Sequence, residues 1–114
     1  MNPVKFYKCL ADETRLRSLL LIQQEAELCV CELTGALKET QPKVSRHLAQ
    51  LRKCGLLLDR RQGQWIFYRI NPQLAGWCLK VIAETATQNK DFLAADLERL
   101  KRMGDRPERM NICC

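Results

Sequence analysis

The chain has 114 residues, of which 46% are hydrophobic and 28% are charged, and it carries a net charge of +6. This length fits one compact domain, and this composition excludes wholesale disorder. The longest apolar runs contain four residues, whereas a transmembrane helix needs about 20, so a membrane span is excluded. Charged residues in the first 17 positions leave no room for the apolar stretch of a secretory signal. We therefore expect a cytoplasmic protein.

Apolar spacing and capping residues predict six helices and one β-hairpin. Asp12 is a good N-cap, Pro42 suits the first turn of a helix, and Gly55 suits the position after a helix end. The expected helices span residues 3–10, 13–25, 29–37, 42–54, 73–88 and 91–103. The expected strands span 56–61 and 64–70 and are joined by a turn at Gln62-Gly63.

The seven cysteines are not expected to form a disulfide framework, because the cytoplasm is a reducing compartment. Free cysteines pack as small hydrophobic residues. We therefore expect Cys9 in the core or at a dimer interface, and Cys54 and Cys78 as packed residues.

The positive charge is concentrated in the middle of the chain. Residues 38–69 contain eight Lys or Arg and only two Asp or Glu, so this segment holds the whole net charge. A localised basic segment is typical of a nucleic-acid contact, although a solvated basic face would look the same.

Two helices joined by a tight turn and followed by a basic hairpin indicate a winged helix-turn-helix, a mainly α fold with a β-hairpin (α+β). In that fold the second helix enters the major groove, where Gln can read adenine and Arg can read guanine. Lys more often contacts the phosphates of the DNA backbone. We assign residues 1–104 to this domain and residues 105–114 to a flexible tail that ends in cysteines. The candidate DNA-binding residues are Gln41, Lys43, Ser45, Arg46, His47, Arg52, Arg60, Arg61 and Gln64.

His47 is the only histidine, and it borders the buried stripe of its helix. It either positions the helix from a half-buried site or contacts a phosphate. Catalysis would need partner residues that the sequence does not offer, so we do not expect an enzyme.

Three stretches carry a resemblance to a known family. They are residues 11–16 (ADETRL), 27–33 (ELCVCEL) and 41–48 (QPKVSRHL), the last followed by Leu51 and by Gly55-Leu56-Leu57. Together they resemble the ArsR/SmtB family, and more narrowly its arsenite- and antimonite-responsive repressors, over about residues 4–80. The resemblance implies a homodimer that represses its own resistance operon and leaves operator DNA when inducer binds. It also implies a dimer interface made by 3–10 and 73–103. A zinc site between C-terminal helices is not expected, because 73–103 contain no His.

Cys29-Val30-Cys31 matches the Cys-x-Cys inducer motif of these repressors. Trivalent arsenic and antimony are soft and prefer thiolate sulfur. The inducer is thus expected on Cys29 and Cys31, and no cofactor is expected for DNA binding. Residues two apart on a helix point about 200° apart, so we expect inducer binding to distort the start of the third helix.

A third cysteine is common in these repressors three residues after the second, but Thr34 stands there in this chain. Cys113 or Cys114 is the best substitute for the third ligand. The terminal pair could also form a second arsenic site or have no role. Alternatively, two thiols suffice, because a mono-organic trivalent arsenical has only two replaceable valences.

Two other functions stay open. One is a repressor that senses thiol oxidation at Cys29 and Cys31 in place of a metalloid. The other is a metalloid carrier or thiol oxidoreductase that does not bind DNA. The usual redox motif, however, is Cys-x-x-Cys near a βαβ unit, and this alternative leaves the basic segment 38–69 unexplained.

Overall fold

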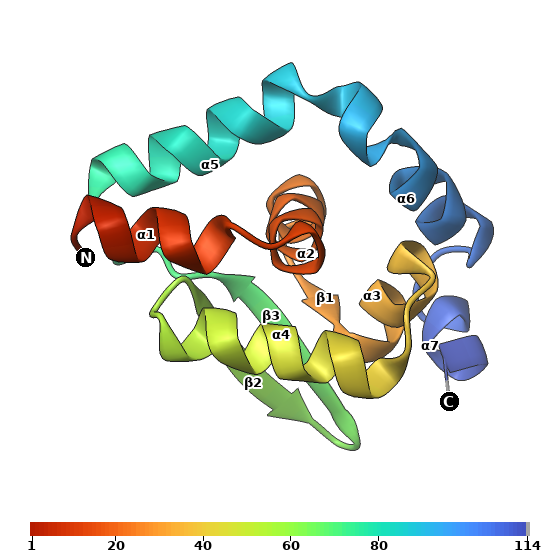
Figure 1. Ribbon diagram of the computed structural model, residues 1–114. Helices are drawn as coiled ribbons and strands as arrows, with labels where there is room; N and C mark the ends of the chain where they lie inside the picture. The colour runs from red at the N-terminus through yellow and green to blue at the C-terminus, as the bar shows by residue number, and fades with distance from the viewer. Residues whose placement is uncertain (114) are drawn as a thin grey trace.

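The computed structural model describes the backbone of residues 1–113 and the side chains of residues 1–111. Its helices are α1 (Pro3–Leu10), α2 (Glu13–Glu25), α3 (Val30–Leu37), α4 (Gln41–Lys53), α5 (Gly76–Gln88), α6 (Lys90–Arg102) and α7 (Glu108–Cys113). Its strands are β1 (Leu28–Cys29), β2 (Leu57–Gln62) and β3 (Trp65–Ile70) (Figure 1). No helix in this described part is long and apolar enough to cross a membrane.

The predicted caps set the helix ends. Asp12 accepts a hydrogen bond from the backbone N–H of Arg15 at 3.0 Å and so satisfies a free donor at the start of α2. Gly55 follows α4 with a φ of 88°, a left-handed conformation that suits glycine. The predicted helices are confirmed to within a few residues, and so is the winged helix-turn-helix.

Helix α2 forms the centre of the core and is surrounded by α1, α3, α4, α5 and α6 (Figure 1). Leu19, Leu20, Leu21 and Ile22 are all fully buried, so α2 is apolar on several faces rather than on one stripe. This burial fixes the positions of α4, α5 and α6, which all pack on α2.

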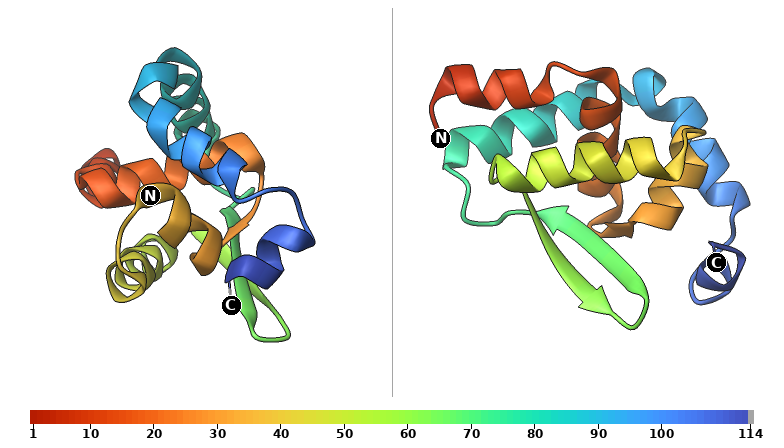
Figure 2. Two further views of the ribbon diagram at one scale, coloured as in Figure 1. Left: turned by 90° about the vertical axis from the view of Figure 1, so that its right-hand side faces the viewer. Right: turned by 60° about the horizontal axis from the view of Figure 1, so that its bottom comes forward.

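The sheet has three strands rather than the expected two, in the order β1-β3-β2. β1 pairs antiparallel with β3, placing Leu28 opposite Tyr68 and Cys29 opposite Phe67. β2 and β3 form the predicted hairpin, which projects away from the helices as a wing (Figure 2). The start of the Cys-x-Cys motif is therefore a strand of the wing sheet.

Two expectations about the cysteines and the tail differ from the structure. Cys9 and Cys54 form a disulfide, with Cα atoms 6.7 Å apart, because α1 lies alongside the C-terminal end of α4 (Figure 1). They were expected to be packed thiols. Within the expected flexible tail, residues 108–113 form α7, in which Arg109 and Met110 are buried.

Candidate nucleic-acid interface and thiol site

Helices α3 and α4 form the helix-turn-helix. Lys38 ends α3 in a left-handed conformation and donates its backbone N–H to the carbonyl of Thr34. Val44, Leu48 and Leu51 bury one face of α4. The opposite face is left for solvent, as a DNA-reading helix requires.

The exposed face of α4 carries most of the predicted base-reading residues. Gln41 and Arg46 are exposed, and Ser45 is half-buried. The Arg46 guanidinium has no hydrogen bond or ion pair with any other described residue, so it is available to a ligand. Lys43 pairs with Glu39 at 3.2 Å, one turn earlier.

The basic residues of the wing are not equivalent. Arg60, on β2, donates two hydrogen bonds of 2.7 Å to the carboxylate of Glu27, the residue before β1. These hydrogen bonds lower the pKa of Glu27. Arg52 pairs with Asp59 at 3.2 Å, whereas Arg61 is exposed and has no partner among the described residues. Arg60 is therefore exposed but ion-paired with an acidic side chain of the same chain, whereas Arg61 is not.

The ring of His47 is mostly buried. Its side chain is 10% exposed, its Nδ1 lies 3.3 Å from Nη1 of Arg15, and its Nε2 lies 3.7 Å from the carboxylate of Asp12. This geometry fits the positioning role, because the ring is held against the start of α2.

Cys29 lies at the junction of β1 and α3. It is 1% exposed and is a free thiol. It is the N-cap of α3, where its sulfur accepts the backbone N–H of Glu32 and the Glu32 carboxylate accepts the N–H of Cys29 at 3.0 Å. Burial raises the pKa of the Cys29 thiol to about 11. At neutral pH the thiol is therefore protonated, and it must lose its proton to become a metalloid ligand.

The prediction that inducer binding must distort the start of α3 rested on both cysteines lying on a helix, and the structure contradicts that premise. Cys29 has extended backbone angles (φ −92°, ψ 166°) and lies outside α3, so the helical step of 100° does not separate it from Cys31. Cys31 is half-buried and is disulfide-bonded in this structure. The two cysteines face one cavity.

This cavity of about 490 Å³ brings the cysteine motif to the DNA-reading elements. Cys29, Val30, Cys31 and Thr34 line one side. The other walls come from α4 and the wing, through Gln41, Ser45, Gln64, Trp65, Ile66 and Tyr68. Three predicted DNA contacts therefore share a cavity with both predicted inducer ligands.

Glu32 and two arginines near the C-terminus form a buried ionic cluster that sequence reasoning missed. Glu32 is fully buried and accepts hydrogen bonds of 3.0 Å from Arg106 and from Arg109. Met110 packs on Cys29 and Phe67, so α7 covers the start of α3. The one sequence signal was a Glu inside the otherwise apolar run 28–33.

Cys113 and Cys114, the predicted third ligands, lie outside the described side chains. Within residues 1–111, no group of three or more His, Cys, Asp or Glu is placed to hold a metal ion. The site that the structure describes thus has two sulfur atoms.

The fold, the exposed face of α4 and the projecting wing define a winged-helix DNA-binding protein with a cysteine site beside its reading helix. A family model described as "Bacterial regulatory protein, arsR family" matches residues 12–57. The chain is 53% identical over 114 residues to the arsenic resistance transcriptional regulator ArsR2 of Pseudomonas putida, covering 100% of this chain and 99% of that relative. The chain belongs to the ArsR family, whose members matched here are transcriptional regulators rather than enzymes.

Two further matches are also named as repressors. The arsenical resistance operon repressor of Escherichia coli is 46% identical over 111 residues, covering 97% of this chain and 95% of its own length. The solved structure of the AntR antimony-specific transcriptional repressor has a TM-score of 0.64 and 30% identity, covering 77% of each chain. Reduced HlyU from Vibrio cholerae has a TM-score of 0.67 and 31% identity, covering 75% of this chain and 86% of its own.

Proposed function

We propose that this protein represses an arsenic-resistance operon in the cytoplasm and is released from operator DNA when trivalent arsenic or antimony binds Cys29 and Cys31. The observation that carries the proposal is the cavity shared by the cysteine motif, α4 and the wing. An inducer acts only through its different affinities for the free and the DNA-bound states. A ligand in this cavity contacts residues that DNA also needs, so the two affinities must differ.

The donors fit a soft, trivalent metalloid. Cys29 offers a free buried thiol, and Cys31 faces the same cavity and supplies a second sulfur once it is reduced. The neighbouring walls from Trp65, Ile66 and Tyr68 are apolar, which suits the organic group of a mono-substituted arsenical.

We further propose Cys113 or Cys114 as the third ligand for inorganic arsenite. α7 supports this, because its residue Met110 packs on Cys29. Replacing Cys113 and Cys114 by serine should weaken release by arsenite and preserve release by phenyl-substituted trivalent arsenic. An unchanged response to both would remove the terminal pair from the ligand set.

The repressor acts as a homodimer. Val4, Tyr7 and Trp77 are exposed large hydrophobic residues on α1 and α5, at 67%, 53% and 37%. Exposed apolar residues that cluster in this way favour a protein interface. Light scattering after gel filtration should give twice the monomer mass of 13.2 kDa.

The decisive experiment uses the reduced Cys29→Ser, Cys31→Ser double variant and labelled DNA from upstream of its own gene. Operator affinity should stay near that of the parent, because serine is nearly isosteric with cysteine. Release by trivalent arsenic should be lost, because a hydroxyl is a poor ligand for a soft centre. Cys78→Ser is the matched control, since Cys78 is also a buried free thiol but lies on α5, and it should respond like the parent.

The alternatives give different results in the same assay. A folded double variant that arsenic still releases at the parent's concentration would refute the assigned site. A metalloid carrier would show no salt-dependent DNA binding. A redox-sensing repressor would be released by oxidants but not by arsenic under reducing conditions.

A further inference from the structure

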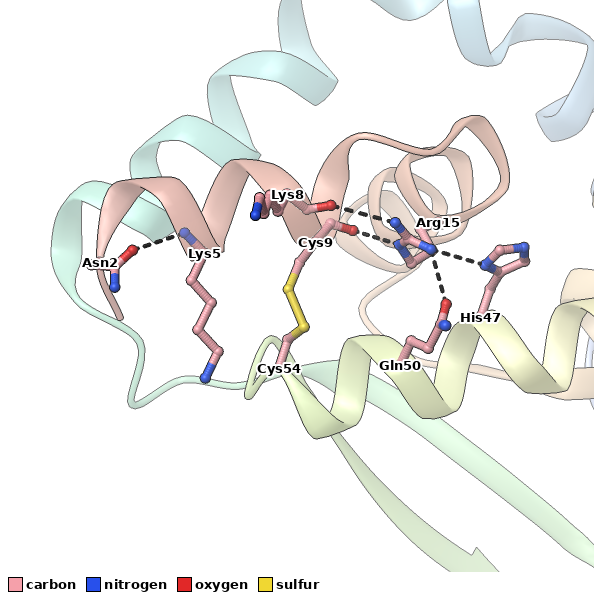
Figure 3. Close-up of a disulfide and its surroundings, with 8 residues drawn as sticks. All are labelled: Asn2, Lys5, Lys8, Cys9, Arg15, His47, Gln50 and Cys54. Atoms are coloured by element: carbon pink, nitrogen blue, oxygen red, sulfur yellow. Dashed lines mark hydrogen bonds between the residues drawn. A yellow bond between two sulfur atoms is a disulfide. The ribbon is translucent and has the colours of Figure 1, made fainter.

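The Cys9–Cys54 disulfide lies outside the site proposed for the inducer. It joins the last turn of α1 to the residue that ends α4, the DNA-reading helix (Figure 3). The two cysteines are 45 residues apart, so the bond closes a long loop that includes α2, α3 and α4.

Contacts other than the disulfide hold the same two elements together. Arg15 donates from Nε to the carbonyl of Cys9 at 2.7 Å and from Nη1 to the side chain of Gln50 on α4 at 2.9 Å. Figure 3 shows Arg15 between the end of α1 and the side chains of Gln50 and His47. The two sulfurs therefore stay close after reduction, which makes the bond reversible without unfolding.

A strongly basic cavity opens beside the disulfide. It has a volume of about 810 Å³ and is lined by both cysteines. Its lining residues include Lys5, Lys8, Arg15 and Lys53 and no acidic residue. Four positive charges around a cysteine pair attract an anionic reaction partner.

We propose that Cys9 and Cys54 form a thiol–disulfide exchange site for anionic low-molecular-weight disulfides and thiols, of which glutathione is the common example. In the oxidising direction, the thiolate of Cys54, the more exposed residue, attacks the small disulfide RSSR and releases one RS⁻. The thiolate of Cys9 then attacks the sulfur of Cys54 and releases the second RS⁻. The protein loses two electrons and two protons, and RSSR gains them as two RSH. The oxidised form locks α1 to the DNA-reading helix.

The test follows the pair directly and needs neither DNA nor arsenic, so its outcome is independent of the proposed function. The reduced full chain is treated with glutathione disulfide, which is anionic, or with cystamine, which is cationic. Thiols are trapped by alkylation, and the Cys9–Cys54 peptide is quantified by mass spectrometry. Each rate is divided by the rate of dithiothreitol with the same disulfide, which removes intrinsic differences in reactivity.

We expect at least a fivefold preference for glutathione disulfide at low ionic strength, and we expect salt to reduce it. Lys5→Gln, Lys53→Gln should lose most of this preference, whereas Lys80→Gln, an exposed lysine on α5, should keep it. Equal normalised rates for the two disulfides would overturn the proposal. So would a Cys9–Cys54 pair that stays reduced in a large excess of glutathione disulfide.

Discussion

Replacing Glu32 by glutamine should destabilise the protein by about 3 kcal/mol. Removing one partner from a buried ion pair costs about 3–5 kcal/mol. The Glu32 side chain is 0% exposed and that of Arg109 is 10% exposed, but Arg106 is 37% exposed and can turn to water. The lower end of the range therefore applies.

The assay is thermal and urea unfolding at pH 7, at one fixed protein concentration because a dimer's stability depends on it. A loss of about 3 kcal/mol corresponds to a fall in Tm of about 12 °C for a domain of this size. Glu98→Gln is the matched control, since Glu98 forms an exposed pair with Arg102 one turn away on α6. It should change stability by less than about 0.5 kcal/mol.

The effect of pH provides a second check. Burial alone would raise the pKa of Glu32, but hydrogen bonds from Arg106, from the Cys29 backbone and from Arg109 outweigh it and leave the pKa below its ordinary value of 4.5. The Glu32 carboxylate is therefore protonated more readily in the unfolded chain than in the native protein. The stabilisation is complete above pH 4.5 and is lost as the pH falls through the lower pKa of the folded state.

The difference in unfolding free energy between the parent and Glu32→Gln should thus be constant near neutral pH and shrink in acid. The reasoning is refuted if the difference at pH 7 is below about 1 kcal/mol, outside the range for a buried pair. It is also refuted if the difference does not narrow below pH 4.5.

Three further predictions concern the DNA and thiol sites. Ser45→Ala and Arg46→Ala should each weaken specific operator binding by about 1–3 kcal/mol and leave the dimer intact, as measured by fluorescence anisotropy against operator and scrambled DNA. Arg61→Ala should reduce the salt slope of DNA binding by about one, whereas Arg60→Ala should leave that slope near the parent's, because Arg60 is paired with Glu27. Since the pKa of Cys29 is about 11, its alkylation in the reduced protein should speed up about tenfold per pH unit between pH 7 and pH 10, and a flat profile followed by mass spectrometry would contradict the assigned burial.

The sequence predicts those parts of this fold that depend on local interactions. Caps such as Asp12 and Gly55 act within one turn, and the apolar stripe of α4 repeats with the helical period, so both are visible in the sequence. The Cys-x-Cys motif is equally local.

The parts that the sequence did not predict depend on distant partners. β1 has two residues, too few for a strand pattern, and it forms only because β3 lies beside it. Glu32 meets Arg109 across 77 positions, and Arg60 meets Glu27 across 33. A basic residue in a wing looks the same in sequence whether it faces DNA or pairs with a carboxylate of the same chain.

The position of Trp65 in the wall of the cysteine cavity gives the protein an intrinsic optical probe. The chain has two tryptophans, and Trp77 lies elsewhere, with its ring 4.9 Å from that of Phe6 beside α1. Indole emission is sensitive to local polarity and to heavy atoms, and arsenic and antimony are both heavy. In a Trp77→Phe protein, Trp65 is the only tryptophan. Its fluorescence would therefore report, without any added label, when a ligand fills the cavity and how fast.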